Sequence, residues 1–139
     1  MYKKILIAND GSEGAAKALV AAMGLAKRFK TELHMVSVEE LPRLPASVDE
    51  VVEEKREANH RFTKVVAAAG ARARAHRVKL NPHIVAGHPV PSIVACVEPQ
   101  GIDLLVIGFM GHSALYNRLI GSTTDRLVEL VPCPVFVVK

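Results

Sequence analysis

Cysteine, aromatic residues and long apolar runs are all scarce in this chain of 139 residues. Its two cysteines, Cys96 and Cys133, are too few for a disulfide framework, and we interpret them as buried free thiols. No apolar run approaches the ~20 residues that a membrane-spanning helix needs. The apolar stretch after Met1 is too short for the core of a signal peptide, so we expect a cytoplasmic protein without a membrane partner.

The scarcity of aromatic residues argues against a nucleic-acid partner. The chain has no tryptophan, two tyrosines and four phenylalanines, and these are not interleaved with its basic residues. The formal net charge is +4, and the densest basic cluster, from Arg72 to Lys79, suits the solvated carboxyl end of a helix. Because a basic cluster without aromatic neighbours is weak evidence for nucleic-acid binding, we expect no such partner.

Patterns typical of catalytic and metal sites are missing as well. The six histidines (residues 34, 60, 76, 83, 88 and 112) show no metal-ligand spacing, so we predict no metal site built from them. The sequence contains no Gly-x-Ser-x-Gly elbow, and spacing pairs neither cysteine with a histidine. We therefore assign no catalytic residue.

What the chain does contain is an alternation of short apolar runs with helical periodicity. Half of its residues are hydrophobic and 23% are charged, as in ordinary soluble proteins, and we expect residues 1–139 to form one domain. Strands are predicted at Lys4 to Asn9, Leu33 to Val38, His83 to Ala86, Leu104 to Ile107 and Val135 to Val138. Helices are predicted after Ser12, from the capping box Ser47 to Glu50 toward Arg77, around Ile93 to Val97, and from Thr124 to Val131.

Apolar strands that alternate with helices predict an α/β fold. We expect an open sheet of five parallel strands with helices on both faces. In such a sheet a ligand binds beyond the carboxyl ends of the strands, where the strand order reverses. The candidate functional residues therefore follow the strands, at Asn9 to Ser12, Val38 to Glu40, Gly87 to Pro89 and Gly108 to Thr123.

The last of these connections is rich in glycine and reads GFMGHSALYNRLIGST. Gly108 and Gly111 permit positive φ and a close approach of the backbone to a ligand. Gly121, Ser122 and Thr123 open the last predicted helix, where unpaired N–H groups and the helix dipole favour an anion. Ser122, three residues before Asp125, also fits a capping pattern. Taken alone, the connection fits a phosphate-binding loop and a pair of tight turns equally well.

Acidic residues follow the first two predicted strands. An Asp before a Gly, as at Asp10, often only makes a turn. At the carboxyl end of a strand it also meets a ligand, and we favour this second interpretation. Glu39 and Glu40 could hold a metal that bridges phosphates, but we favour solvated loop charges for both.

The order and spacing of several motifs resemble the universal stress protein family over the whole chain. Gly108-x-x-Gly111, nine residues, and then Gly121-Ser122 resemble the nucleotide-binding motif of that family. Four further segments resemble elements of the family. Lys3 to Ile7 with DGS (10–12) resembles its first strand and turn, and GHPVPSIV (87–94) resembles its third strand-to-helix turn. DLLVIG (103–108) resembles its fourth strand, and VPCPVFVV (131–138) resembles its closing strand.

The resemblance implies an adenine-nucleotide-binding fold, usually dimeric, with ATP and Mg²⁺ as the expected ligands. It implies the following roles: Asp10 near the ribose and phosphates, the backbone near Val38 at the adenine edge, Gly108 and Gly111 beside the ribose and phosphates, and Gly121, Ser122 and Thr123 at the phosphates. One position departs from the family pattern, because Met110 stands where a basic or polar residue is frequent. His112, Arg118 and Arg126 are the candidates to supply the missing charge.

The closing strand predicts how the chain assembles. Val135, Phe136, Val137 and Val138 are all apolar, and an edge strand leaves N–H and C=O groups that invite another chain. The family resemblance favours pairing at the same place. We predict a homodimer in which two such strands run antiparallel.

Three functional classes remain open. The first, which we adopt, is an ATP-binding protein with a regulatory or stress-response role and at most slow ATP hydrolysis. The second is a dimeric protein-interaction module that is not an enzyme and binds no nucleotide. The third is an enzyme that splits ATP at the α-phosphate, which would need a Ser-Gly-Gly-x-Asp-Ser loop that Asn9 to Gly14 lacks.

Overall fold

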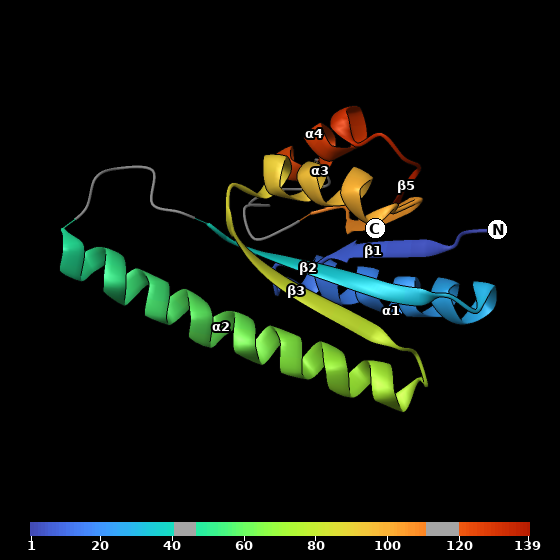
Figure 1. Cartoon of the computed structure of the whole chain (residues 1–139), viewed down its shortest axis with the longest axis horizontal. Helices are drawn as coiled ribbons and strands as arrows, with labels where there is room; N and C mark the ends of the chain where they lie inside the picture. The colour runs from blue at the N-terminus through green and yellow to red at the C-terminus, as the bar shows by residue number, and fades with distance from the viewer. Residues whose placement is uncertain (41–46, 111–119) are drawn as a thin grey trace.

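The computed structural model describes residues 1–40, 47–110 and 120–139. Within these ranges five parallel strands form one sheet in the order β3-β2-β1-β4-β5 (Figure 1). The elements in chain order are β1 Lys4–Ala8, α1 Glu13–Phe29, β2 Glu32–Glu40, α2 Val48–Ala75, β3 Leu80–Gly87, α3 Pro89–Gln100, β4 Leu104–Gly108, α4 Ser122–Leu130 and β5 Val135–Val138. The predicted open parallel sheet is confirmed, and its order reverses at β1.

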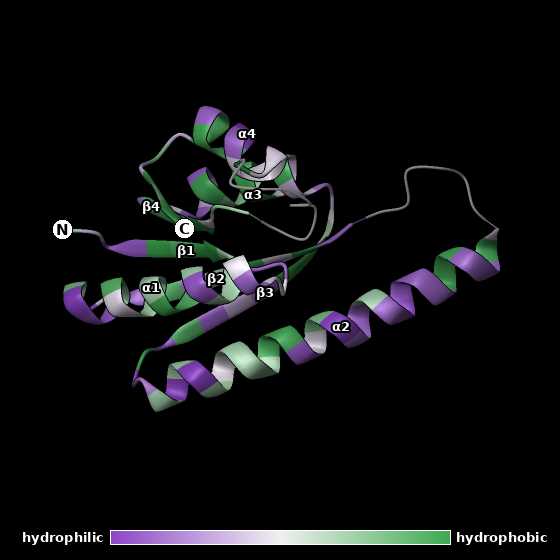
Figure 2. Ribbon diagram, turned by 180° about the vertical axis from the view of Figure 1, so that it is seen from behind, coloured by the Kyte–Doolittle hydropathy of each residue, from purple (hydrophilic) through white to green (hydrophobic). Residues whose placement is uncertain are grey.

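Helices cover both faces of the sheet, as predicted (Figure 1). Ile5 and Ile7 of β1 pack with α1 and α2 in one core, whereas Leu6 between them packs with α3 and α4 in the other. This alternation follows from the period of two along a strand. In Figure 2 β1 is largely hydrophobic, as expected for a strand buried on both faces.

The strands β2 and β3 are longer than the apolar pattern predicts. They pair from Leu33↔Leu80 to Glu40↔Gly87, so the ladder includes Pro82 and several polar residues. Polar side chains are accommodated because β3 is an edge strand, where a proline is also tolerated. Backbone pairing thus extends both strands past the apolar runs that the sequence marks.

The long helix α2 has two unlike halves. Its buried residues, Phe62, Ala69 and Ala73, all lie in the second half. Val48 and Val52 in the first half are 78% and 53% exposed, and this half extends past the sheet (Figures 1 and 2). The predicted capping box is confirmed, because Glu50 N–H donates to Ser47 Oγ and Ser47 N–H donates to Glu50 Oε2. None of the helices in the described ranges is both long and apolar enough to cross a membrane.

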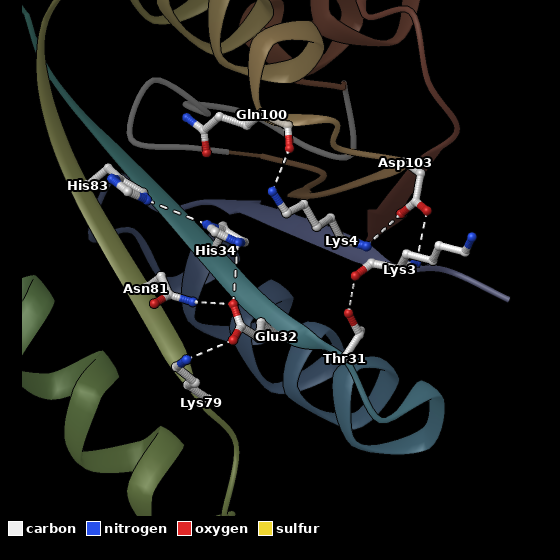
Figure 3. A network of polar contacts seen from close by, with 10 residues as sticks. All are labelled: Lys3, Lys4, Thr31, Glu32, His34, Lys79, Asn81, His83, Gln100 and Asp103. Atoms are coloured by element: carbon white, nitrogen blue, oxygen red, sulfur yellow. Dashed lines mark hydrogen bonds and ion pairs between the residues drawn. The ribbon is translucent and has the colours of Figure 1, made fainter.

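The amino ends of the strands carry a polar network (Figure 3). The Asp103 carboxylate accepts hydrogen bonds from the backbone N–H groups of Lys3 (2.8 Å) and Lys4 (3.0 Å). Glu32 accepts from Lys79 Nζ at 2.7 Å, which lowers the pKa of its carboxyl group. Side chains from several elements thus satisfy one another and the backbone at this end of the sheet.

A histidine pair joins β2 to β3 within the same network. His34 Nδ1 lies 3.5 Å from His83 Nε2, and His34 Nε2 lies 4.0 Å from Glu32 Oε2, a distance at which an ion pair forms only with a protonated ring (Figure 3). His34 Nε2 is buried and has no hydrogen-bond partner among the described residues. Burial, followed by the positive charge of Lys4, lowers the pKa of His34.

Candidate functional site

A cavity of about 480 Å³ lies at the carboxyl ends of β1, β2 and β4. Its volume falls in the ~300–1,000 Å³ range of small-molecule sites. It occupies the place that the parallel sheet predicts, next to the strand at which the order reverses. The predicted site residues that line it are Asp10, Val38, Gly108, Gly121, Ser122 and Thr123. Gly111, the remaining predicted residue, lies outside the described residues, as do His112 and Arg118.

The turn from β1 to α1 forms one wall of the cavity. Asn9 Oδ1 accepts a hydrogen bond from Gly11 N–H at 3.0 Å, and Asp10 Oδ1 accepts one from Ser12 N–H at 2.9 Å. Gly11 has φ 81°, a conformation that favours glycine. Ser12 in turn caps α1, because its Oγ accepts from Ala15 N–H at 3.1 Å. Asp10 therefore shapes the turn and lines the cavity at once.

The end of β2 presents backbone groups at the cavity wall. The pairing of β1 with β2 ends at Ala8↔Val36, and Asn9 N–H donates to Val36 C=O at 2.9 Å. Because the backbone groups of successive strand residues point to opposite neighbours, those of Val38 face the same side as those of Val36. They lie beyond the last β1 pair, where β1 has turned away. Val38 thus brings one N–H donor and one C=O acceptor to the cavity.

The neighbouring glutamates correct an expectation. Both Glu39 and Glu40 belong to β2 rather than to a solvated loop. Glu39 is 7% exposed, and its Oε1 has no hydrogen-bond partner among the described residues. Glu40 is exposed and lines the cavity. Extension of the β2–β3 ladder includes the backbone of both residues in the sheet, which the apolar pattern did not show.

Two glycines bring the end of β4 against the first turn of α1. A Cβ at Gly108 would lie 2.8 Å from the backbone carbon of Gly14, and a Cβ at Gly14 would overlap the backbone oxygen of Met110. Gly108 is not among the glycines with positive φ, so close packing, rather than the φ freedom that we expected, requires it. Sequence reasoning missed Gly14, although a glycine in a helix costs stability and so signals a special contact.

The start of α4 forms the opposite wall. Gly121, not Ser122, is the N-cap, so the predicted capping role of Ser122 is wrong. The reason is that Gly121 C=O already accepts the first helical bond, from Asp125 N–H at 2.9 Å. Thr124 Oγ1 donates to Gly108 C=O at 2.7 Å and ties the helix to β4. The first-turn N–H groups and the Ser122 hydroxyl therefore lie at the cavity with the positive end of the helix dipole.

Charged side chains of both signs line the cavity. Asp10 and Glu40 are acidic, and Arg61 of α2 is the one lining residue of the described ranges that carries a positive charge. The Arg61 guanidinium lies 4.7 Å from the centroid of the Phe62 ring, which also lines the cavity. Sequence reasoning missed both residues, because helical periodicity does not show what lies beyond the end of the sheet. No group of three or more potential metal ligands occurs in the described part of the chain.

Comparison with known proteins identifies the family. The model of the universal stress protein family matches residues 1–139. Universal stress protein MJ0531 of Methanocaldococcus jannaschii is 33% identical over 148 residues, covering 100% of this chain and 83% of that protein. Universal stress protein YxiE of Bacillus subtilis is 30% identical over 148 residues, covering 100% of this chain and 100% of that protein. The chain belongs to the universal stress protein family.

Solved structures share its fold. Universal stress protein UspA from Lactobacillus plantarum superposes with a TM-score of 0.89 at 24% identity, over 99% of this chain and 98% of that one. A universal stress protein in complex with cAMP has a TM-score of 0.78 at 23% identity, over 99% of this chain and 97% of that one. A family protein from Arabidopsis thaliana with AMP bound has a TM-score of 0.73 at 17% identity, over 99% and 91%. The open parallel α/β fold predicted from the sequence, which is Rossmann-like, is thereby confirmed.

Proposed function

We propose that this chain binds ATP, together with Mg²⁺, in the cavity and acts as a regulatory stress-response protein. One observation carries the proposal: predicted site residues from three separate connections converge on a single cavity of suitable size. Two proteins of the same fold were solved with the adenine nucleotides cAMP and AMP. Their ligands support an adenine nucleotide here as well.

The cavity offers a partner for each part of such a ligand. The N–H and C=O of Val38 match the donor and acceptor edge of adenine. The first turn of α4, with the Ser122 and Thr123 hydroxyls, suits the phosphates, since N–H groups and the helix dipole attract an anion. Gly108 keeps the backbone close to the ligand, and Asp10 reaches the ribose and phosphates.

Asp10 and Glu40 also fit Mg²⁺. This ion is usually held by one or two carboxylates, several waters and phosphate oxygens rather than by a cage of protein ligands. The two carboxylates that line the cavity meet that need, and when bound the ion would neutralise phosphate charge. The described lining includes no histidine, cysteine or lysine, and its two carboxylates, Asp10 and Glu40, are assigned here to Mg²⁺ rather than to proton transfer. We therefore expect ATP turnover far below the ~10 per second typical of enzymes.

Calorimetric titration of nucleotide-stripped protein with Mg-ATP tests the proposal, alongside mass spectrometry of any small molecule released on denaturation. Gly121→Val should abolish binding. Ser122→Ala should weaken it roughly ten- to a hundredfold, the value of one hydrogen bond to a charged phosphate. Because Ser122 is not the cap, circular dichroism of that variant should be unchanged. If the unaltered protein gives no heat and releases no nucleotide, the interaction-module alternative replaces this proposal.

We also propose a homodimer formed through β5. This strand lies at the edge of the sheet, and its Phe136 is 45% exposed. Antiparallel pairing of Val135 to Val138 with the same strand of a second copy would satisfy the exposed backbone edge. Phe136→Lys should shift light scattering toward the monomer, whereas Val128→Lys, at a residue that is 49% exposed on α4, should not. A monomeric unaltered protein at micromolar concentration would exclude the dimer.

A further inference from the structure

Among the described residues that line the cavity, the positively charged one, Arg61, comes from α2, an element that the glycine-rich connection does not include. Arg61 is exposed, and its guanidinium lies over one face of the Phe62 ring at 4.7 Å from the centroid. Phe62 itself is 1% exposed and is fixed in the core beneath. A guanidinium that stacks on a fixed ring keeps fewer rotamers, so less conformational entropy is lost when it binds a ligand.

Packing of α2 against the β1–α1 turn determines where Arg61 lies relative to the cavity. The Val65 side chain lies 2.9 Å from where a Cβ at Gly11 would stand, so this turn of α2 contacts the β1–α1 turn. Residues four apart lie on one helix face, which places Arg61 one turn beyond Val65, at the level of the cavity. Arg61 takes no part in the Glu32–Lys79 ion pair or in the 4.0 Å contact of His34 with Glu32.

The charge balance of the cavity explains what such a residue would do. Unless Mg²⁺ is held between them, the carboxylates of Asp10 and Glu40 repel the phosphates of a nucleotide that enters. Phe109 and Met110, the first residues after β4, carry no charge to offset this repulsion. The first turn of α4 supplies partial positive charge, and Arg61 supplies a full one.

We infer that Arg61 recognises the phosphate charge of the bound nucleotide and makes the cavity selective for polyphosphates over nucleosides. This inference rests on the proposed adenine-nucleotide site and adds to it the class of ligand preferred. The planar guanidinium, with its fork of N–H donors, matches phosphate oxygens better than an ammonium does. Arg61 thereby supplies, from another element of the fold, a positive charge that Met110 lacks.

The test compares ATP, AMP and adenosine by calorimetric titration of the full nucleotide-stripped chain. Arg61→Gln, which removes the charge but keeps much of the length, should raise the Kd for ATP about tenfold. The increase should be smaller for AMP and absent for adenosine. Arg61→Lys should retain part of the ATP affinity. Lys64→Gln is the matched control, because it removes one charge from an exposed α2 residue that does not line the cavity, and it should change none of the three affinities.

Each alternative result has its own meaning. An equal loss for adenosine and ATP would assign Arg61 to base stacking and overturn the inference, as would an unchanged Kd for ATP in Arg61→Gln. If the unaltered protein binds none of the three ligands, the proposed function fails instead. Thermal unfolding of Arg61→Gln at the temperature of the unaltered protein would show that a loss of affinity is not a loss of fold.

Discussion

The two ends of the parallel sheet differ in what their polar groups contact. At the amino ends, Asp103 accepts hydrogen bonds from the backbone of Lys3 and Lys4, and Glu32 accepts one from Lys79 (Figure 3). The hydrogen-bonding capacity of these carboxylates is therefore used within the protein. At the carboxyl ends, hydroxyl groups, carboxylates and a guanidinium line a cavity of about 480 Å³. The same strands thus place a structural network at one end and a candidate ligand site at the other.

This difference gives each end a different expected response to mutation. Groups that satisfy one another contribute to the stability of the fold, whereas groups that face a cavity contribute when a ligand binds. Changes at the amino ends should therefore move the free energy of unfolding and leave affinity alone. One change should affect both stability and affinity only where a group has both roles, as the backbone at the cavity wall and the Asp10 side chain do.

The largest effect is expected where the two roles coincide, at Gly108. A Cβ there would meet the backbone of Gly14 at 2.8 Å, so Gly108→Ala should cost about 1–3 kcal/mol of unfolding free energy and abolish nucleotide binding. Chemical denaturation and calorimetry measure the two. Gly24→Ala on the exposed face of α1 is the control: nothing lies within 4 Å of its Cβ, and it should stabilise the protein by about 0.5–1 kcal/mol. Equal behaviour of the two variants would contradict the close-packing explanation.

A smaller effect, confined to stability, is expected at Asp103. Asp103→Ala removes the acceptor of two backbone N–H groups and should lower the unfolding free energy by about 1–2 kcal/mol. Asp103→Asn keeps one carbonyl oxygen as an acceptor, so its unfolding free energy should lie between those of the unaltered protein and Asp103→Ala. The Kd for ATP should stay within about twofold in both variants. A lower affinity without a loss of stability would refute the separation of the two ends.

The smallest effect is a pH dependence of stability that originates at His34. Burial and Lys4 lower its pKa in the folded protein, so below its ordinary pKa of about 6.5 the unfolded chain binds more protons. Stability should therefore fall as pH drops below about 6.5, and His34→Gln should reduce this slope in denaturation curves at pH 7.5 and 5.5. The nearby pair of Glu32 and Lys79 acts at lower pH, because the pKa of Glu32 is itself lowered. If stability depends on pH equally in the unaltered protein and in His34→Gln, the pH dependence originates at another group.

Much of the fold could be predicted because the strands are apolar throughout and the topology of a parallel sheet leaves few choices. The same topology brings Asp10, Val38 and Ser122 to one edge, although the sequence separates them widely. The topology alone, without side-chain contacts, places these residues together. The carboxyl ends of the strands could therefore be predicted as a group.

The remaining features depend on tertiary contacts that periodicity does not encode. Arg61 and Phe62 reach the cavity only because of the path that α2 takes across the sheet, and Gly14 is required by a backbone contact with β4. The N-cap of α4 is Gly121, one residue before the Ser122 that the pattern indicates, because glycine and serine are both common N-caps and sequence does not choose between neighbours.

The first half of α2 contains no buried residue, and this affects where the protein unfolds locally. A helical segment that buries no side chain is marginal in water, so the amides from Val48 toward Arg61 should exchange with deuterium through local fraying. Those beyond Phe62, anchored in the core, should exchange only in larger openings. The boundary falls at Arg61, so a protease would cut the projecting turns first, and cleavage would be slower from the point where α2 begins to line the cavity.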